Sequence, residues 1–199
     1  MRGLLNVDKA VFPNENAFSF PEIPAFDTKV CCDSWSDFDC AVGRKQLPDG
    51  VHFYISDYKF ERLWKNPDKY IPFLHGFDYV VQPDFSLYYD FPIALQIYNK
   101  FRNHWLARYL CQAGVPVIPN VSPSCPWCYE WSFLGYPKRS VVAFSDIGCV
   151  RDSRARLLCQ VSFDRMLYEL EPIQVLYFTR SEEHAPEGVT VVKIPIERR

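Results

Sequence analysis

The sequence predicts an α/β fold in which strands and helices alternate and the strands form a parallel sheet. Short apolar runs recur along the 199 residues, and they are continuous, as in parallel strands that are covered on both faces. Longer segments with apolar residues at helical spacing lie between these runs. Nearly every run ends in a polar side chain, at the position where parallel α/β proteins bind their ligands.

The first 50 residues are predicted to be irregular, because four prolines interrupt any regular element. These prolines are Pro13, Pro21, Pro24 and Pro48. We expect residues 1–50 to wrap around the core, and whether they also donate one short strand stays open. A length of 199 residues suits one domain, so residues 51–199 are expected to form a single α/β domain.

The domain is predicted to begin with a strand over residues 51–56 and to continue with a helix over residues 59–74 that breaks at Pro67. A short buried strand follows at residues 79–81. The next helix begins at Pro92, whose missing N–H group suits a first helical turn. Its predicted apolar face consists of Ala94, Ile97, Phe101, Trp105 and Tyr109.

Gly114 is placed to cap the C-terminus of this helix, because glycine readily adopts the left-handed conformation that such caps need. Four further strands are predicted over residues 115–118, 140–144, 173–178 and 189–194. A helix over residues 152–170 separates the second of these strands from the third. The side chains of this helix that are predicted to point inward are Leu157, Val161, Met166 and Leu170.

The distribution of polar strand ends favours a reduced or incomplete (β/α) barrel over a doubly wound open sheet. An open sheet would use only the strand ends beside its switch point, whereas a barrel gathers all of them at one mouth. The predicted polar ends are Asp57, Asp84, Asn120, Ser122, Ser145, Asp146 and Thr179. A complete barrel needs eight strands and about 250 residues, so the six strands predicted here leave the two architectures in close competition.

Asp84 is the first candidate for a catalytic residue. It follows the apolar Tyr79–Val81 run, and Pro83 forces an extended approach to it. A carboxylate at this point suits a nucleophile, a base or a ligand anchor, and the alternative is a cap on the following helix. Asp57 and Asp146 are weaker catalytic candidates. If two of the three carboxylates faced each other, one pKa would rise and an acid–base pair would result.

Polar residues around these carboxylates are candidates for substrate binding. Those at strand ends are Ser86, Asn120, Ser122 and Ser145. Gln96 and Arg102 lie on the polar side of the long helix, where either could hold a phosphate or carboxylate. For that helix side, a solvated face is the favoured alternative.

Cysteine spacing raises the alternative of a structural zinc site. Cys125 and Cys128 have the spacing of a metal knuckle, and the remaining thiolates would come from Cys31, Cys32 or Cys40. A redox pair and free thiols are the other two interpretations. The sequence therefore implies no cofactor firmly. The three remaining cysteines are expected to act as small core residues, namely Cys111, Cys149 and Cys159.

The composition of the chain indicates which classes of binding partner are expected. The net charge of −2 gives no general attraction to nucleic acid or to acidic membranes. We expect a cytoplasmic protein without a membrane partner, because no apolar run approaches the ~20 residues of a membrane span. A nucleotide or nucleic acid would need a local site. An aromatic loop that could instead grip a host protein contains Trp127, Tyr129, Trp131 and Phe133.

Four stretches give the chain a resemblance to domain-of-unknown-function family 4417, over about residues 45–180. They are residues 52–64, residues 83–88, the helix side with Gln96, Arg102, Trp105 and Tyr109, and residues 117–121. The resemblance implies an origin in bacteria, phages or other mobile elements, and it implies no activity. In this family a Val-Ser-Trp sequence usually follows the Ile-Pro strand, whereas this chain has Val-Ser-Pro-Ser-Cys at residues 121–125.

The order of the strand-end motifs is also similar to that of barrel enzymes that exchange bases in tRNA or DNA. Those enzymes use a strand-end aspartate as a nucleophile, but their second glycine-rich signature is not clearly present here. Two function classes follow. The first is a mobile-element enzyme that acts on a nucleotide or nucleic acid at the strand ends. The alternative is a non-catalytic protein that sequesters a host protein or a small signalling molecule.

Overall fold

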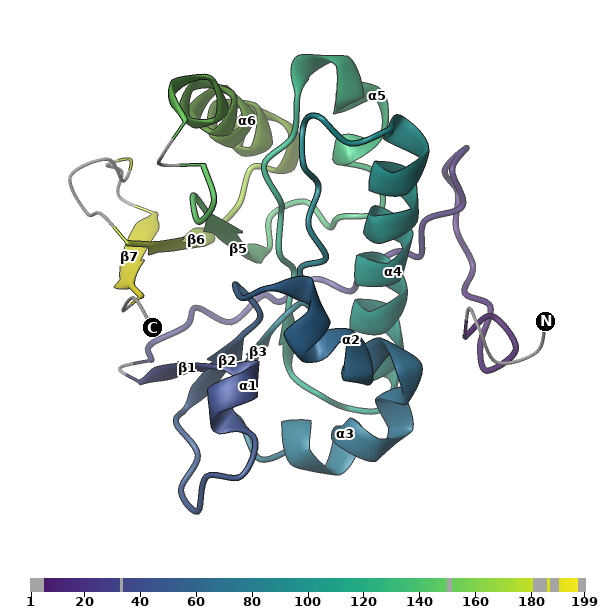
Figure 1. Ribbon diagram of the computed structural model, residues 1–199, viewed down its shortest axis with the longest axis vertical. Coiled ribbons are helices and arrows are strands. Elements are labelled where there is room, and N and C mark those ends of the chain that lie inside the picture. Colours follow the sequence, from purple (N-terminus) through teal and green to yellow (C-terminus); the bar gives the residue numbers. More distant parts are fainter. Residues whose placement is uncertain (1–5, 33, 150–151, 181–185, 187–189, 197–199) are drawn as a thin grey trace.

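The computed structural model describes residues 6–32, 34–149, 152–180, 186 and 190–196 (Figure 1). All strand pairs in this part of the chain are parallel, and they form two sheets. The predicted α/β class, with parallel sheets and alternating strands and helices, is confirmed.

The first sheet has four strands in the order in which they occur in the chain. They are β1 (Trp35–Asp37), β2 (Gly50–His52), β3 (Tyr79–Val81) and β4 (Val117–Ile118). The helices that connect them are α1 (Phe38–Ala41), α2 (Asp57–Lys65), α3 (Pro67–Leu74) and α4 (Ile93–Gln112). Helices α2 and α3 separate at Asn66, which has φ −150° and ψ 73°. The predicted break at Pro67 is therefore confirmed, since proline disfavours helical geometry in the preceding residue.

The second sheet has three strands, again in chain order. They are β5 (Val141–Ser145), β6 (Gln174–Thr179) and β7 (Val191–Pro195). The last strand was predicted to begin at Val189, which lies outside the described residues. Helix α6 (Ser153–Leu170) connects β5 to β6 and covers this sheet in Figure 1. The turn η1 (Pro126–Cys128) and the short helix α5 (Tyr129–Ser132) lie between β4 and β5.

A single bridge joins the two sheets just beyond β4. The Val121 N–H donates to the carbonyl of Ala143 (2.9 Å), and the Ala143 N–H donates to the carbonyl of Pro119 (2.8 Å). Strands β1 to β7 therefore follow one another in space as they do in the chain. Among the described residues, no pairing closes the sheet between β7 and β1.

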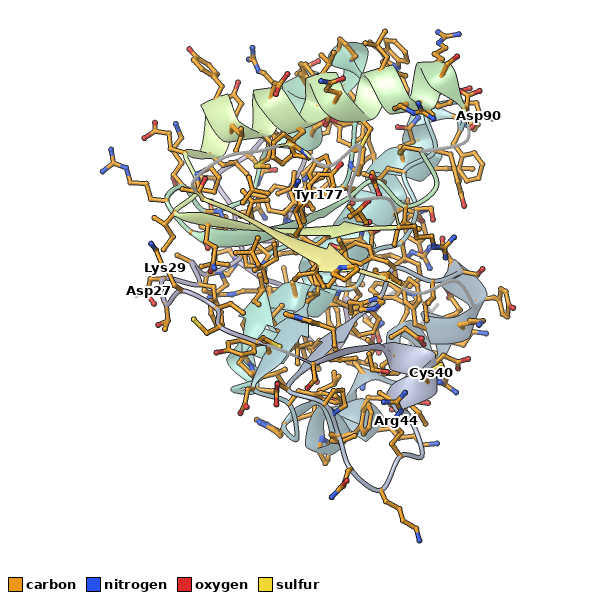
Figure 2. The ribbon with its side chains drawn as sticks, turned by 90° about the vertical axis from the view of Figure 1, so that its left-hand side faces the viewer. Asp27, Lys29, Cys40, Arg44, Asp90 and Tyr177 are labelled. Atoms are coloured by element: carbon orange, nitrogen blue, oxygen red, sulfur yellow. The ribbon has the colours of Figure 1, made fainter. Side chains whose placement is uncertain are left out.

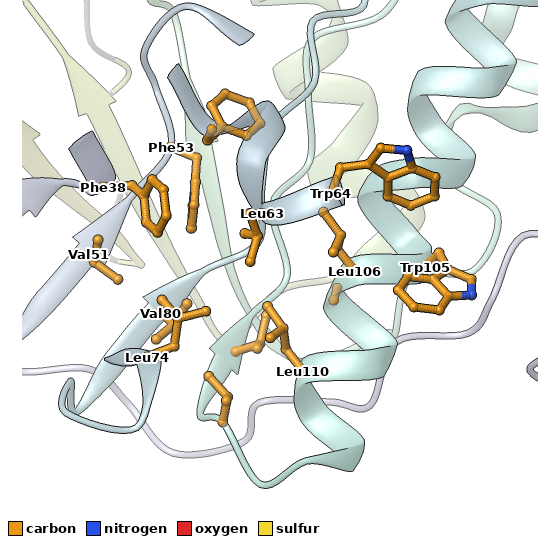
Figure 3. Packing of buried hydrophobic residues seen from close by; sticks show 14 of the residues in the cluster. Phe38, Val51, Phe53, Leu63, Trp64, Leu74, Val80, Trp105, Leu106 and Leu110 are labelled. Carbon is orange, nitrogen blue, oxygen red and sulfur yellow. The ribbon is translucent and has the colours of Figure 1, made fainter. Parts of the chain in front are cut away.

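The outer face of the first sheet packs against its connecting helices. Val51 and Val80 point toward these helices and meet Leu74, Leu106 and neighbouring side chains (Figure 3). Successive residues of a strand point to opposite faces, so Val81 belongs to a different cluster. The helices thus lie on one face of the sheet, which leaves the other face to be covered by the second half of the chain.

That inner face is shared by both sheets. One apolar cluster takes side chains from each of the strands β3 to β7 and from Tyr54, which follows β2. Its members include Tyr54, Val81, Ile118, Val141, Ala143, Leu176, Phe178 and Ile194. The ring of Trp35 in β1 also meets Phe178 of β6 edge-on, with 5.0 Å between centroids. The two sheets therefore bury one face against each other.

Helix α6 presents a different face to the core from the one that the sequence predicts. Leu157 and Val161 are exposed (60% and 39%), so their predicted inward position was wrong. Met166 and Leu170 are buried as expected. Phe163 also lies inside and packs edge-on against Tyr177, which lies beneath the helix in Figure 2. The buried face of α6 also includes the small residues Ala155, Cys159 and Ser162, which apolar spacing alone did not reveal.

Residues 6–32 contain no helix or strand, and hydrogen bonds attach their beginning to α2 and their later part to the second half of the chain. The Ile23 N–H donates to the Gly135 carbonyl (2.9 Å). Val30 pairs with the Gln174 side chain through both its N–H (2.7 Å) and its carbonyl (3.0 Å). The sequence left open whether the segment expected to wrap the core also donates a strand. It does donate one, because β1 belongs to the first sheet.

Candidate functional site

The segment that follows β3 carries Asp84 and pairs with side chains instead of a strand. Asn103 of α4 makes two hydrogen bonds with the Phe85 backbone, accepting from its N–H (2.7 Å) and donating to its carbonyl (3.1 Å). Asn99 donates to the Ser86 carbonyl (2.8 Å). Because buried backbone groups need partners, these two amides hold Asp84 in place.

The polar side of α4 is therefore buried, and the expectation of a solvated face was wrong. Besides the two asparagines, this side carries Lys100, which is 2% exposed and donates to the Ser132 carbonyl (2.8 Å). Its ammonium lies 2.9 Å from Nε2 of His104. These polar groups of α4 face inward because they bind backbone groups of the segment after β3 and of the end of α5.

Asp84 does not cap a helix. Helix α4 begins at Ile93, after Pro92, and no side chain caps it. Instead, the Asp84 carboxylate accepts a hydrogen bond from the Ser122 hydroxyl (2.6 Å). Burial raises the pKa of Asp84 to about 6, and the charge of Asp57 adds to this rise, while the hydrogen bond from Ser122 and the Asn120 side chain oppose it. A carboxyl group with such a pKa can exchange protons near neutral pH.

Asn120 lies behind this carboxylate and is fixed on three sides. Its side-chain oxygen accepts from the Tyr54 hydroxyl (2.7 Å), its carbonyl accepts from the Tyr136 hydroxyl (2.6 Å), and its N–H donates to the Gln82 side chain (2.9 Å). Burial raises the pKa of both tyrosines, so both phenols stay protonated. The Asn120 amide nitrogen is close enough to lower the pKa of Asp84, although no hydrogen bond of normal geometry joins them.

A cavity of about 310 Å³ opens in front of Asp84, beyond the carboxyl ends of the strands. This volume is at the small end of the range for small-molecule sites. Polar groups of the lining come from Tyr54, Ser56, Asp84, Ser86, Ser122, Ser124 and Arg180, and apolar or aromatic groups include Ile55, Leu87, Tyr88, Tyr89, Ile147 and Leu158. The guanidinium of Arg154 lies 5.6 Å from the ring centre of Tyr89, so a second cation stands near the cavity.

Three of the nine predicted catalytic and substrate-binding residues line this cavity, and two others lie next to them. Asp84, Ser86 and Ser122 line it. Asp57 lies beside them at the start of α2, where its carboxylate accepts from the Ser86 hydroxyl (2.8 Å) and from the Ser86 N–H (3.2 Å). Asn120 supports the group from behind. These predicted carboxylate and hydroxyl side chains therefore lie together, and their catalytic and binding roles stay predictions.

Gln96 and Arg102 lie elsewhere, and their predicted roles in substrate binding stay predictions. Gln96 donates to the Phe91 carbonyl (2.8 Å) inside the protein. Arg102 is largely buried, pairs with Glu61 (2.9 Å) and stacks 3.6 Å above the centre of the Phe85 ring. Both contacts join α4 to neighbouring segments, so Arg102 has its charge partner within the fold.

Ser145 is the last residue of β5 and Asp146 follows it, and neither residue lines the first cavity. The Ser145 hydroxyl donates to the Phe178 carbonyl (2.9 Å) and accepts from the Ile147 N–H (3.1 Å). Asp146 accepts from the Thr179 hydroxyl (2.8 Å) and lines a second cavity of about 290 Å³. Their contacts connect the ends of β5 and β6, and a ligand role for either one stays a prediction.

The two cysteines of the metal-knuckle spacing are both buried. Cys125 lines the first cavity, and burial raises the pKa of its thiol to about 11. Cys128 packs with Phe20 and Trp131. Within the ranges that the structure describes, no three histidine, cysteine or acidic side chains are grouped as metal ligands. Zinc binding by these thiols stays a prediction.

Sequence reasoning missed Tyr54 and Arg180 as parts of the cavity wall. Tyr54 was expected inside a strand, whereas β2 ends at His52 and Tyr54 lines the cavity.

Of the aromatic loop, Trp131 is buried and Trp127 is 52% exposed. A second set of exposed apolar side chains, here called the 88–98 surface, consists of Tyr88, Phe91, Ile93, Leu95 and Tyr98. Among the described helices, none has the length and apolar character to cross a membrane.

Comparison with known proteins gives the family. The model of the domain of unknown function DUF4417 matches residues 12–194. The Gene 1 protein of Mycobacterium phage L5 is 34% identical over 152 residues, which cover 73% of this chain and 64% of that protein. The Gene 1 protein of Mycobacterium phage D29 is 26% identical over 179 residues, which cover 86% and 64%.

The chain thus spans less than two thirds of the length of these phage relatives. No solved structure matches it. The family match begins 33 residues earlier than the resemblance seen in the sequence and ends later, so it includes most of the irregular N-terminal segment. The chain belongs to the DUF4417 family and is similar to proteins of mycobacteriophages.

Proposed function

We propose that this protein is a phage-type enzyme that acts on a nucleotide or nucleic acid in the cavity before Asp84. The observation that carries the proposal is the Asp84 carboxyl group, which combines a pKa of about 6, a hydrogen bond from Ser122 and a position in the cavity wall. Perturbed carboxyl groups in clefts are typical of catalytic sites. In this role Asp84 acts as a general base or as a nucleophile.

The surrounding groups suit a nucleotide. Arg180 in the wall and Arg154 beside Tyr89 supply positive charge for a phosphate. Tyr88 and Tyr89 supply flat aromatic surfaces on which a base can stack. The Ser86 and Ser122 hydroxyls are placed to bond polar groups of the ligand. Asp57, joined to Ser86, would add the second carboxylate of an acid–base pair.

The proposed architecture is a reduced (β/α) barrel. Strands β1 to β7 follow one another in chain order, the helices of the first half lie on the outer face, and inward side chains of both sheets share one cluster. The strand order among the described residues has no reversal, which a doubly wound sheet needs. In barrels the active site lies at the carboxyl ends of the strands, where Asp84 stands here.

The test is a thermal-shift screen with nucleoside 5′-monophosphates and short single-stranded oligonucleotides. A ligand at 100 times its Kd stabilises a protein by about 2.7 kcal/mol. For a chain of this size that is a rise in Tm of about 5–10 °C. We expect at least one probe to produce such a rise, and mass spectrometry of the incubated probe to reveal a product. Asp84→Asn should abolish the product.

The matched control is Asp90→Asn, which changes an exposed carboxylate on the same segment outside the cavity wall. It should keep both the shift and the product. If no probe shifts the Tm of the natural protein, or if Asp84→Asn forms product at the natural rate, the proposal is wrong.

The second candidate is a non-catalytic protein that sequesters a host protein. The observation in its favour is the 88–98 surface, whose exposed apolar side chains continue to the cavity through Tyr88. Such patches often mark protein interfaces. This candidate predicts that Ile93→Ser with Leu95→Ser abolishes capture of one defined host protein, while Asp84→Asn leaves capture intact. If the protein is the proposed enzyme, Asp84→Asn abolishes product formation, whereas Ile93→Ser with Leu95→Ser leaves product formation intact.

A further inference from the structure

Two cysteines form the partition between the cavity in front of Asp84 and the second cavity, which Asp146 lines. The first cavity has a volume of about 310 Å³ and the second about 290 Å³. Cys149 and Cys159 line both cavities, and they are the residues that the two linings have in common. A small molecule that enters either cavity therefore reaches the same pair of thiols.

The two side chains also pack in one apolar cluster, in which Cys159 is a buried member and Cys149 packs against it. The two thiols are close enough for each to shift the pKa of the other. Cys149 belongs to the turn after β5, next to Gly148, which has φ +93° and nothing within 4 Å of the place where a Cβ atom would stand. Cys159 belongs to the buried side of α6. Cys149 lies on a turn and not inside a helix or strand, so a local backbone shift can bring the two sulfurs to the roughly 2.05 Å of a disulfide bond.

We propose that Cys149 and Cys159 are a redox-active pair that hydrogen peroxide converts reversibly to a disulfide in the wall between the cavities. The Cys149 thiolate attacks one peroxide oxygen, the O–O bond breaks, and the hydroxide that leaves takes up a proton. Cys149 then carries a sulfenic acid. The Cys159 sulfur attacks the Cys149 sulfur, its proton goes to the departing hydroxide, and water leaves. Two thiols are oxidised by two electrons, and one peroxide becomes two waters.

The different environments of the thiols assign Cys149 as the attacking group. The hydrogen bond from Cys159 lowers the pKa of Cys149, although burial and the charges of Asp146 and Asp84 oppose this effect. The same contact and burial raise the pKa of Cys159. Burial raises the pKa of Cys125 to about 11 and also raises that of Cys128. Since thiolates and not thiols react with peroxides, the Cys125–Cys128 pair should react later in spite of its redox-type spacing.

The proposal differs from the interpretation of these cysteines in the sequence. There Cys149 and Cys159 were expected to be core residues, and Cys125 with Cys128 were the candidates for zinc or redox chemistry, with free thiols as the alternative. Cys149 is only partly buried, and Cys125 shares the first cavity with it. The chemistry does not depend on a nucleotide in that cavity. A disulfide at this place would join the end of β5 covalently to α6.

The test is oxidation of the folded protein with an equimolar amount of hydrogen peroxide, followed by alkylation of the remaining thiols and peptide mass mapping. We expect the first linked peptides to contain Cys149 and Cys159, and dithiothreitol to separate them. In Cys159→Ser, dimedone should label a sulfenic acid at Cys149. In Cys149→Ser, Cys159 should stay fully alkylatable at the same peroxide dose.

Cys111→Ser is the matched control, because Cys111 is a half-buried thiol of α4 outside both linings, and this variant should form the Cys149–Cys159 disulfide like the natural chain. The key measurement needs no substitution, so a variant that fails to fold does not remove the test. The proposal is overturned if Cys149 and Cys159 both remain alkylatable after equimolar peroxide, or if the first disulfide joins Cys125 to Cys128.

Discussion

Substitution of Asp84 by asparagine should make the protein more stable at neutral pH, even though it should remove activity. The folded protein holds the pKa of Asp84 at about 6, against 3.8 for an ordinary aspartate. A raised carboxyl pKa means that folding favours the protonated form. The associated stabilisation is therefore fully present below pH 3.8 and is lost as the pH rises through 6.

The magnitude follows from the two pKa values. At pH 7.5 Asp84 is ionised in both states, and a difference of about 2.2 pKa units corresponds to about 3 kcal/mol of destabilisation relative to a neutral side chain. At pH 4.5 the folded form is almost fully protonated, and the same calculation leaves about 1 kcal/mol. The asparagine oxygen can still accept the hydrogen bond from Ser122, so the substitution mainly removes the charge.

Urea unfolding of the natural protein and of Asp84→Asn at both pH values measures these quantities. We expect the variant to be more stable by up to about 3 kcal/mol at pH 7.5, and its advantage to shrink by about 2 kcal/mol at pH 4.5. Asp90→Asn, the exposed control, should stay within about 0.5 kcal/mol at both values. An Asp84→Asn variant that is less stable at pH 7.5, or an advantage that does not change with pH, would refute the reasoning.

Two other substitutions test the surroundings of the site. Asn103→Ala leaves the N–H and carbonyl of Phe85 without partners, which should cost about 2–5 kcal/mol in urea unfolding; a loss below 1 kcal/mol would show that this pairing does not hold the segment. Trp131→Ala empties a buried position and should lower stability by about 3–5 kcal/mol, whereas Trp127→Ala on the same loop should change it by less than 1 kcal/mol; similar losses in a thermal melt would contradict the assigned burial.

The sequence predicted the parts of the structure that local chemistry determines. Continuous apolar runs, as at residues 79–81, marked the strands, and Pro67 marked the break between α2 and α3. The carboxyl ends of parallel strands meet at one edge, so Asp84 and Ser122 were expected near each other and are hydrogen-bonded.

The parts that the sequence did not predict depend on partners that are distant in the chain. The polar side of α4 resembles a solvated face, but Asn103 turns it inward because the Phe85 backbone needs partners. The sequence also did not reveal that Arg102 pairs with Glu61, which is 41 residues away. Nothing in the spacing of Cys149 and Cys159 revealed that α6 would bring the two thiols together, since Leu157 suggested a different inward face.

The attachment of the N-terminal segment also determines the order in which this chain can be completed during synthesis. Val30 leaves the ribosome early, whereas the Gln174 side chain that pairs with it follows 144 residues later. At translation rates of about 5–20 residues per second, the gap is roughly 7–30 s. During that time β2, β3 and α4 can already assemble, while Phe26 and Val30 still lack Ser140 and Gln174, the residues that bind them. The segment around Val30, although made early, should therefore be among the last to dock.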